Sequence, residues 1–203
     1  MVTAAPAERG NQRYRTRKDL IAAAARLMKE GRKPNLEEVA ETARVSRATA
    51  YRYFPSIEAL LVEAAVDIAT PDTSTLFGDN ATDPEARIDR AEAAMHRMAF
   101  DNEKAIRLIL AAALGRGDRE DVPVRQNRRT ALIEAALAPA QGRFKKATYE
   151  RLKAALALIF GSESMIVFRD VLRLDDKTAR EVKSWAVRAL VRAALAESTA
   201  RER

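Results

Sequence analysis

Apolar residues recur at intervals of three and four through most of this chain, which is the period of an amphipathic helix. The first such segment covers about residues 13–29, and its apolar positions are Leu20, Ile21, Ala24, Leu27 and Met28. Gly31 and Pro34 then interrupt the pattern, because glycine favours helix ends and proline cannot continue a helix. The pattern predicts one helix that ends just before Gly31.

Capping residues and helix breakers divide the rest of the pattern into further helices. Asn35 and Glu38 have the spacing of a capping box, and Ser46 can cap a third helix that ends at about Phe54. Pro55 breaks that helix and precedes a fourth, which runs to about residue 69. Later helices are expected over residues 84–101, 102–114, 123–138, 146–172 and 175–198, with turn-rich loops at 70–82 and 115–121.

The composition agrees with an all-α fold of about nine helices. Seven glycines and seven prolines in 203 residues are too few for the closely spaced turns of an all-β chain. The absence of cysteine excludes disulfides and cysteine-based zinc sites, and a single histidine excludes a histidine-rich metal site. We therefore expect no metal and no cofactor.

No segment resembles a targeting or membrane sequence. The longest apolar run, residues 108–114, is much shorter than the roughly 20 residues of a membrane span. Residues 1–11 lack the apolar core of a signal peptide. We expect a cytoplasmic protein with no membrane partner.

The net charge of +7 is concentrated near the N-terminus, since basic and acidic residues nearly balance over residues 66–203. Glu8 is the only acidic residue before Asp19, whereas the basic residues of this stretch are Arg9, Arg13, Arg15, Arg17 and Lys18. A basic segment of this kind suits contacts with DNA phosphates or with the minor groove. The alternative is a disordered tail that only increases solubility.

Residues 35–54 have the pattern of two short helices joined by a tight turn, as in a helix-turn-helix. Small or apolar residues occupy the inward positions, which are Val39, Ala40, Ala43, Val45, Ala50 and Tyr53. The outward positions of the third helix are Arg47, Ala48, Thr49, Tyr51 and Arg52. These side chains can bind phosphates and read base edges, so we interpret the face as DNA-binding. A merely solvated face is the alternative, and an exposed tyrosine argues against it.

The same residues carry a family resemblance. The segments LIAAAARLMKEG and NLEEVAETARVSRATAYRYFPSIEALLVEAA, and above all V-S-x-x-T-x-Y-R-Y-F-P-S-x-E-A-L-L from Val45 to Leu61, resemble the N-terminal DNA-binding domain of TetR/AcrR-type repressors. The resemblance covers about residues 13–65. It implies a homodimer on double-stranded DNA, with the third helix in the major groove and C-terminal helices that form an effector pocket and a dimer interface.

By matching position, the resemblance implies that Thr49 and Tyr51 contact bases or phosphates and that Tyr53 contacts the DNA backbone. Two residues depart from the family pattern: Arg44 replaces the usual turn glycine, and Ile57 replaces a frequent lysine. If Arg44 has a positive φ, its side chain costs on the order of 1 kcal/mol, and it can reach a phosphate. The predicted DNA-binding residues are Arg44, Ser46, Arg47, Ala48, Thr49, Tyr51, Arg52, Tyr53, Arg13 and Arg15.

The predicted domains are a flexible basic arm (1–12), a three-helix helix-turn-helix domain (13–65) and a helical ligand-binding and dimerisation domain (66–203). The last two helices are apolar over more than one face, which indicates that they pack on a second subunit as well as on their own core. The predicted interface residues are Leu156, Ile166, Trp185, Ala189 and Ala193. A compact monomer is the alternative.

Candidate effector residues form a weaker pattern. Methionine and aromatic residues cluster on one helix, and a glutamate interrupts the apolar stripe of a later helix, so the predicted ligand residues are Met95, Met98, Phe100, Ile109 and Glu163. Plain core packing is the alternative for the first four residues, and pairing with an arginine across the dimer or contact with solvent is the alternative for Glu163. His96 lies four residues after Glu92, which predicts an ion pair on a solvated face.

These patterns predict a sequence-specific DNA-binding transcriptional regulator. The resemblance implies a ligand-responsive repressor that binds a palindromic operator as a homodimer. The alternatives are an architectural protein that coats DNA without sequence preference and a regulator controlled by a protein partner. An enzyme that uses His96 and Glu163 is disfavoured, because the sequence has no metal set, phosphate-binding loop or nucleophile motif around them.

Overall fold

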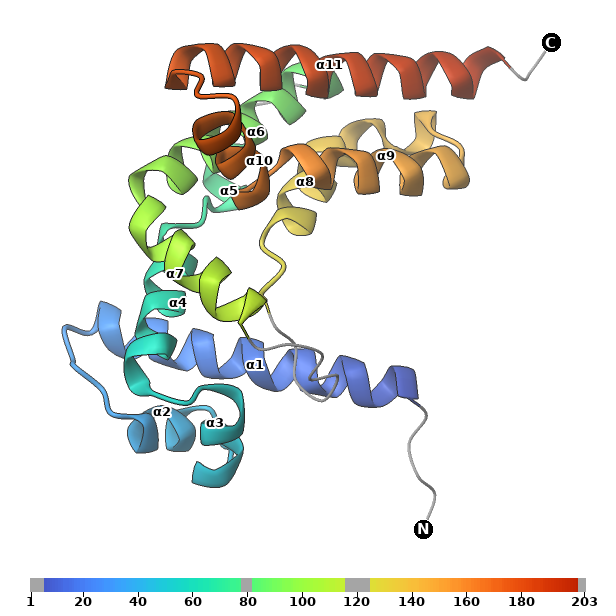
Figure 1. Cartoon of the computed structure of the whole chain (residues 1–203). Coiled ribbons are helices and arrows are strands. Elements are labelled where there is room, and N and C mark those ends of the chain that lie inside the picture. Colours follow the sequence, from blue (N-terminus) through green and yellow to red (C-terminus); the bar gives the residue numbers. More distant parts are fainter. Residues whose placement is uncertain (1–5, 78–81, 116–124, 201–203) are drawn as a thin grey trace. The chain divides into compact units, whose positions relative to one another are not determined.

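The computed structural model describes residues 6–77, 82–115 and 125–200, and within these ranges the chain is helical without any β-strand (Figure 1). The helices are α1 (Pro6–Lys29), α2 (Leu36–Thr42), α3 (Arg47–Tyr53), α4 (Ile57–Ala69), α5 (Thr73–Leu76), α6 (Pro84–Asp101), α7 (Glu103–Leu114), α8 (Arg129–Leu137), α9 (Lys146–Ile159), α10 (Ser162–Ile166) and α11 (Asp176–Ala200). A 3₁₀ segment, Ala138–Arg143, follows α8, and a π-helical turn, Val167–Val171, follows α10. The predicted all-α fold class is confirmed.

The helices group into two compact units. The N-terminal unit contains α1–α4 and α7, and the C-terminal unit contains α5, α6 and α8–α11. The sequence-based boundary between residues 65 and 66 placed the segment of α7 in the C-terminal domain, whereas α7 packs against α4 of the N-terminal unit.

In the N-terminal unit, α1 packs against α2 and α4, and α2 packs against α3. The buried core includes the predicted apolar face of α1 and the inward residues of the helix-turn-helix, such as Leu20, Ile21, Ala24, Leu27, Val39, Ala40, Ala50 and Leu60. Helix α1 ends where predicted: Gly31 has φ +77°, and its amide donates to the carbonyl of Met28. A left-handed residue at this position is a common way to end a helix.

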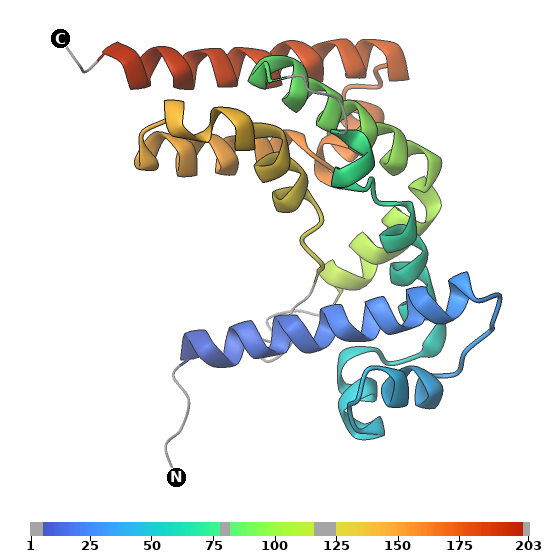
Figure 2. The ribbon, with the colours of Figure 1, turned by 180° about the vertical axis from the view of Figure 1, so that it is seen from behind.

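In the C-terminal unit, α11 lies along both α6 and α9, and α8 packs against α6 and α9 (Figure 2). Ile88 and Met95 of α6, Leu152 and Leu156 of α9, and Val187 and Val191 of α11 are buried in this unit. Helix α6 begins as predicted after Asp83, whose carboxylate accepts the amide of Ala86 at 2.9 Å.

The predicted long helix over residues 146–172 is wrong, because the chain bends sharply at Gly161. This residue has φ +98° and ψ −153°, a conformation that a side chain makes unfavourable. A Cβ atom there would also lie 3.2 Å from Nη2 of Arg129. Helix α9 therefore ends at Ile159, and the separate short helix α10 follows.

Three smaller differences concern two helix starts and one predicted loop. Helix α1 begins at Pro6, so residues 6–12, predicted as an arm, are helical. Helix α8 begins at Arg129 and not near residue 123, which lies outside the described residues, as do residues 116–121 of the predicted loop. The predicted loop at 70–82 contains the short helix α5, which Asp72 caps by accepting the amide of Ser74.

Candidate DNA-binding surface

Helix α2 is fixed at its start by the predicted capping box. The Asn35 side-chain oxygen accepts the amides of Glu37 and Glu38 at 3.0 and 2.9 Å, and the Glu38 carboxylate accepts the amide of Asn35 at 2.8 Å. This bond from the Asn35 amide lowers the pKa of Glu38, which keeps its carboxylate ionised. The cap sets where α2 begins and therefore the position of the turn before α3.

Helix α3 is capped by Ser46, as predicted. Its hydroxyl accepts the amide of Thr49 at 3.1 Å, and the two hydroxyl oxygens lie 2.9 Å apart. Ala50 and Tyr53 face the core. The helix is therefore held from one side by the core and at its start by the cap.

The opposite side of α3 is the exposed face that the sequence predicted. Arg47, Ala48, Tyr51 and Arg52 are exposed, and Tyr51 presents 51% of its surface. Thr49 is half-buried at the edge of this face. The Arg47 guanidinium forms an ion pair with Glu37 of α2, which holds the arginine beside the face.

Tyr53 differs from the expectation that it contacts DNA. It is only 1% exposed, and the Arg52 guanidinium lies 5.5 Å from its ring centroid. A side chain this deeply buried positions α3 on the core, and a direct contact with DNA is not supported.

The turn residue Arg44 has φ 57°, the left-handed conformation for which the sequence analysis allowed. Its amide donates to the carbonyl of Glu41 at 3.0 Å, and its exposed side chain leaves the turn on the outside. The conformation costs roughly 1–2 kcal/mol for a residue other than glycine. Ile57, the second departure, packs against the core, which accounts for an apolar residue there.

The basic residues of α1 divide into two groups. Arg13 lines a groove with Thr16 of α1 and with Ser46, Thr49 and Arg52 on the other side, and Arg15 is exposed. Arg13 can therefore reach a polyanion that lies on α3, and a DNA contact by Arg15 stays a prediction. The side chain of Arg9 lies outside the described residues.

Arg17 does not contribute to the exposed part of the basic segment that precedes Asp19. It is 2% exposed, donates from Nη2 to Oε1 of Glu63 at 2.6 Å, and lies 4.7 Å from the ring centroid of Phe54. Because Arg17 lies on the inner side of α1, its guanidinium pairs with Glu63 of α4. The interpretation of Arg17 as a phosphate-contacting residue is wrong.

The five predicted ligand residues do not share one pocket. Met95 and Met98 are buried in the core of the C-terminal unit, and Phe100 lies beside His96 with ring centroids 4.3 Å apart. Ile109 lines a cavity of the N-terminal unit. Glu163 is exposed and pairs at 2.7 Å with Arg129 of the same chain, and not with an arginine across a dimer.

The predicted dimer residues also have different surroundings. Trp185 is 74% exposed, Ala193 is exposed, and Ile166 and Ala189 are half-buried. Leu156 is completely buried in the core of its own unit, so the expectation that it faces a partner is wrong.

The prediction that His96 and Glu92 lie on a solvated face is wrong. Both are buried, because α6 turns this side toward α11. Lys183 of α11 lies 3.1 Å from the Glu92 carboxylate and 3.2 Å from Nδ1 of His96. Because an ammonium group only donates, Nδ1 accepts, and Nε2 donates to Asp176 at 2.8 Å.

Sequence reasoning missed Lys183, although a signal was present. Ala179, Val187 and Val191 are buried on one side of α11, and Lys183 occupies the missing position in this series of four-residue steps. A lysine in an apolar stripe indicates a buried partner, because an unpaired ammonium group is costly to bury.

We expect the free energy of unfolding to decrease as the pH falls from about 7 to about 5. Burial lowers the pKa of His96 below 6.5, the nearby Lys183 acts in the same direction, and Asp176 opposes them. The unfolded chain therefore binds this proton at a higher pH than the folded chain does. The contribution of neutral His96 to the free energy of unfolding is fully present above pH 6.5. It is lost as the pH falls through the lower pKa of the folded state.

One proton limits this slope to about 1.4 kcal/mol per pH unit. Urea denaturation of the wild type and of His96→Gln at several pH values measures it. His96 is the single histidine of the chain, so the variant should lose most of the dependence in this range. Equal slopes would assign the effect to other groups.

Within the described part of the chain, no group of three or more histidine, cysteine, aspartate or glutamate side chains is arranged to hold a metal ion. None of the helices described there combines the length and the hydrophobicity that crossing a membrane requires.

Comparison with known proteins agrees with the geometry of α2 and α3. Residues 20–64 match the family described as bacterial regulatory proteins, tetR family. No curated protein and no solved structure matches the chain. The matched segment begins in α1, includes the capped α2 and α3, and ends in α4. The chain is therefore a DNA-binding transcriptional regulator with an N-terminal domain of the tetR family.

Proposed function

We propose that the chain is a ligand-responsive repressor that binds a palindromic operator as a homodimer in the bacterial cytoplasm. The exposed face of α3 carries this proposal. Arg47, Tyr51 and Arg52 present two guanidinium groups and a phenol on a helix that is fixed by its cap and core. A helix with these groups fits the major groove, where arginine pairs with guanine and phosphates fix the register.

Arg13 and Arg44 add basic side chains next to the exposed face of α3. Arg13 lies across a groove from α3, and the exposed side chain of Arg44 leaves the turn before it. Both can bind phosphates that flank the bases read by α3. We assign residues 13–65 as the DNA-binding domain on this basis, and residues 6–12 extend α1 at its N-terminal end.

The homodimer is proposed from the surface of the C-terminal unit. Val171, Val182 and Trp185 are large apolar side chains left exposed near the start of α11 and just before it. Exposed apolar surface of this kind favours a contact with a second copy. A two-fold dimer places two α3 helices on half-sites about 34–36 Å apart, which requires an inverted repeat.

We infer the ligand response and the repressor role from the domain order: α5, α6 and α8–α11 form a second helical unit in addition to the one that contains α3. Control by a protein partner is the alternative to a small molecule. No reaction is assigned to the chain, because members of the matched family are regulators.

Selection from random duplex DNA with the purified protein, at near-physiological salt, tests the proposal. Enrichment of an inverted repeat is expected. Salt-sensitive binding with no enriched motif would favour an architectural protein that coats DNA. Sedimentation in the same buffer should give a dimer, and a 22.5 kDa species alone at micromolar concentration would exclude it.

With the selected operator, Tyr51→Ala and Thr49→Ala are each expected to weaken binding by about 1–3 kcal/mol, or roughly 5- to 150-fold in Kd. Tyr51 is exposed on the face, and Thr49→Ala keeps the backbone amide that Ser46 caps. Both variants should therefore stay folded. Fluorescence anisotropy measures the change, and Tyr51→Phe separates the contribution of the ring from that of the hydroxyl. Wild-type affinity in both alanine variants would remove these two assignments.

A further inference from the structure

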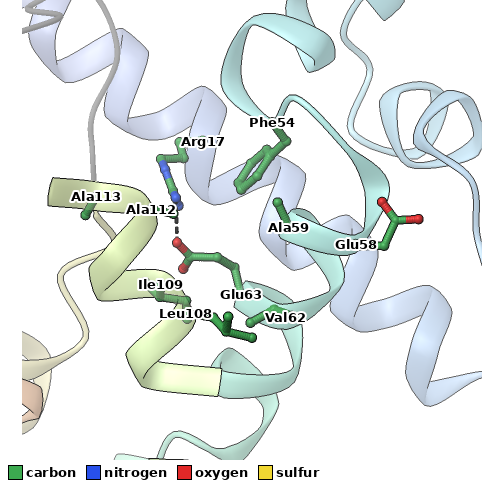
Figure 3. Close-up of a pocket in the computed structure, with 10 residues that line it drawn as sticks. All are labelled: Arg17, Phe54, Glu58, Ala59, Val62, Glu63, Leu108, Ile109, Ala112 and Ala113. Atoms are coloured by element: carbon green, nitrogen blue, oxygen red, sulfur yellow. Dashed lines mark hydrogen bonds and ion pairs between the residues drawn. The ribbon is translucent and has the colours of Figure 1, made fainter. Parts of the chain in front are cut away.

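A cavity of about 290 Å³ lies inside the N-terminal unit, between α1, α4 and α7 (Figure 3). Its walls are mostly apolar and include Phe54, Val62, Leu108, Ile109 and Ala112. Leu108 is 62% exposed, and Ala112 is also exposed, so these two residues of α7 mark the mouth. The cavity is separate from the exposed face of α3 that we assign to DNA.

The size of the cavity restricts what it can hold. An engineered apolar cavity of about 150 Å³ stays dry and binds benzene. A cavity of about 290 Å³ is nearly twice as large and lies close to the lower end of typical ligand pockets, which hold roughly 300–1,000 Å³. By this proportion, the cavity accommodates a body of two rings, or about 12 non-hydrogen atoms.

One part of the wall is polar. Arg17 and Glu63 face each other there at 2.6 Å, and their side chains are 2% and 5% exposed (Figure 3). Because Arg17 and Glu63 neutralise each other, the pair offers no uncompensated charge to a charged ligand. A hydroxyl or carbonyl group can still hydrogen-bond to the pair at little cost. Glu58, which also lines the cavity, further disfavours an anion.

We propose that this cavity binds a neutral two-ring small molecule that carries one hydrogen-bonding group, and that this molecule is the effector of DNA binding. The second part rests on the proposed function, and it places the effector in the N-terminal unit. The sequence predicts an effector site among the C-terminal helices instead, and Ile109 is the one of the five predicted ligand residues that lines this cavity.

The position of the cavity connects it with the DNA-binding face. Phe54 directly follows α3, and Arg17 lies one helical turn after Arg13, which lines the groove beside α3. A ligand that contacts Phe54 and Arg17 therefore touches the two elements that position α3. The ligand changes the DNA affinity by the ratio of its own affinities for the two arrangements of these elements. Such coupling is typically about 5- to 150-fold.

The probe for binding is 2-naphthol, which has two rings and one hydroxyl and is neutral at pH 7. Calorimetry should show one saturable site per chain, and 2-naphthoate, the anion of similar size, should bind at least about tenfold more weakly. Ala112→Trp, which places an indole at the mouth, should weaken 2-naphthol binding by at least about tenfold. The matched control is Ala111→Trp, since Ala111 is also exposed on α7 but does not line the cavity.

Methyl NMR gives an independent location for the probe. Signals of Val62, Leu108 and Ile109 should shift during the titration, whereas those of Val187 and Val191, buried in the C-terminal unit, should not. Equal 2-naphthol binding by both tryptophan variants, or shifts confined to the C-terminal unit, would overturn the site. Equal binding of 2-naphthoate would overturn the neutral ligand class.

Operator binding without the probe is measured first, so that the two proposals fail separately. If the operator binds and 2-naphthol does not, the cavity proposal fails while the proposed function stands. If 2-naphthol binds in the cavity and no operator is found, the binding site stands and the proposed function fails. If both bind and saturating 2-naphthol leaves operator affinity unchanged, the effector role is overturned.

Discussion

Replacing Lys183 by methionine while Glu92 remains is expected to lower the free energy of unfolding by about 3–5 kcal/mol. Both side chains are completely buried, and their charged atoms lie 3.1 Å apart. Burial lowers the pKa of Lys183, while the neighbouring Glu92 acts against this shift. The variant leaves a buried carboxylate with Arg180 at 3.3 Å as its remaining cation, and it removes the donor to His96.

Urea denaturation followed by circular dichroism measures this change. The matched control is Lys177→Met on the same helix, where the side chain is 86% exposed and lies 4.0 Å from Glu181. An exposed pair of this kind contributes about 0–1 kcal/mol. The double variant Glu92→Leu with Lys183→Met should recover much of the loss, because it removes both buried charges. A loss no larger than that of the control would show that the pair does not stabilise the unit.

The helix-turn-helix could be predicted from the sequence because its signals are local. Asn35 and Ser46 cap helices within three residues of themselves, and a left-handed turn residue needs no distant partner. The side of α3 that faces the core follows from residues three and four apart, such as Ala50 and Tyr53. The exposed face of α3 was therefore predicted correctly from the same spacing, apart from the DNA contact assigned to Tyr53.

The pairing of the buried charges could not be predicted because it depends on packing between distant segments, although the position of Lys183 in an apolar stripe indicated that its side chain is buried. Glu92 and Lys183 come from α6 and α11, and on α6 alone Glu92 and His96 have the spacing of a solvated ion pair. The contact between α6 and α11 decides that this side is inside. The break at Gly161 was missed for a related reason, since the residue that approaches Gly161 most closely, Arg129, is distant in the sequence and no proline stands next to the glycine.

Arg17 gives the second large effect, because its two interpretations predict opposite results. As a member of a basic arm, it would contribute about one unit to the slope of log K against log salt and little to stability. As the buried partner of Glu63, it contributes to stability and not to the slope. The Arg17 side chain is 2% exposed and lies 2.6 Å from the Glu63 carboxylate. Because its removal leaves a buried carboxylate, we expect Arg17→Met to lower the free energy of unfolding by about 3–5 kcal/mol.

The matched control is Arg15→Met, which removes an exposed arginine two positions earlier on the same helix. Urea denaturation should show a large loss for Arg17→Met and a change within about 0.5 kcal/mol for Arg15→Met. Operator titrations over a range of salt concentrations, at a temperature where both variants are folded, should show the reverse: a smaller slope for Arg15→Met and the wild-type slope for Arg17→Met. A reduced slope together with wild-type stability in Arg17→Met would show that Arg17 contacts DNA phosphates. Because the ion pair joins α1 to α4, its loss should loosen the attachment of α1 to the core while leaving the number of phosphate contacts on α3 unchanged.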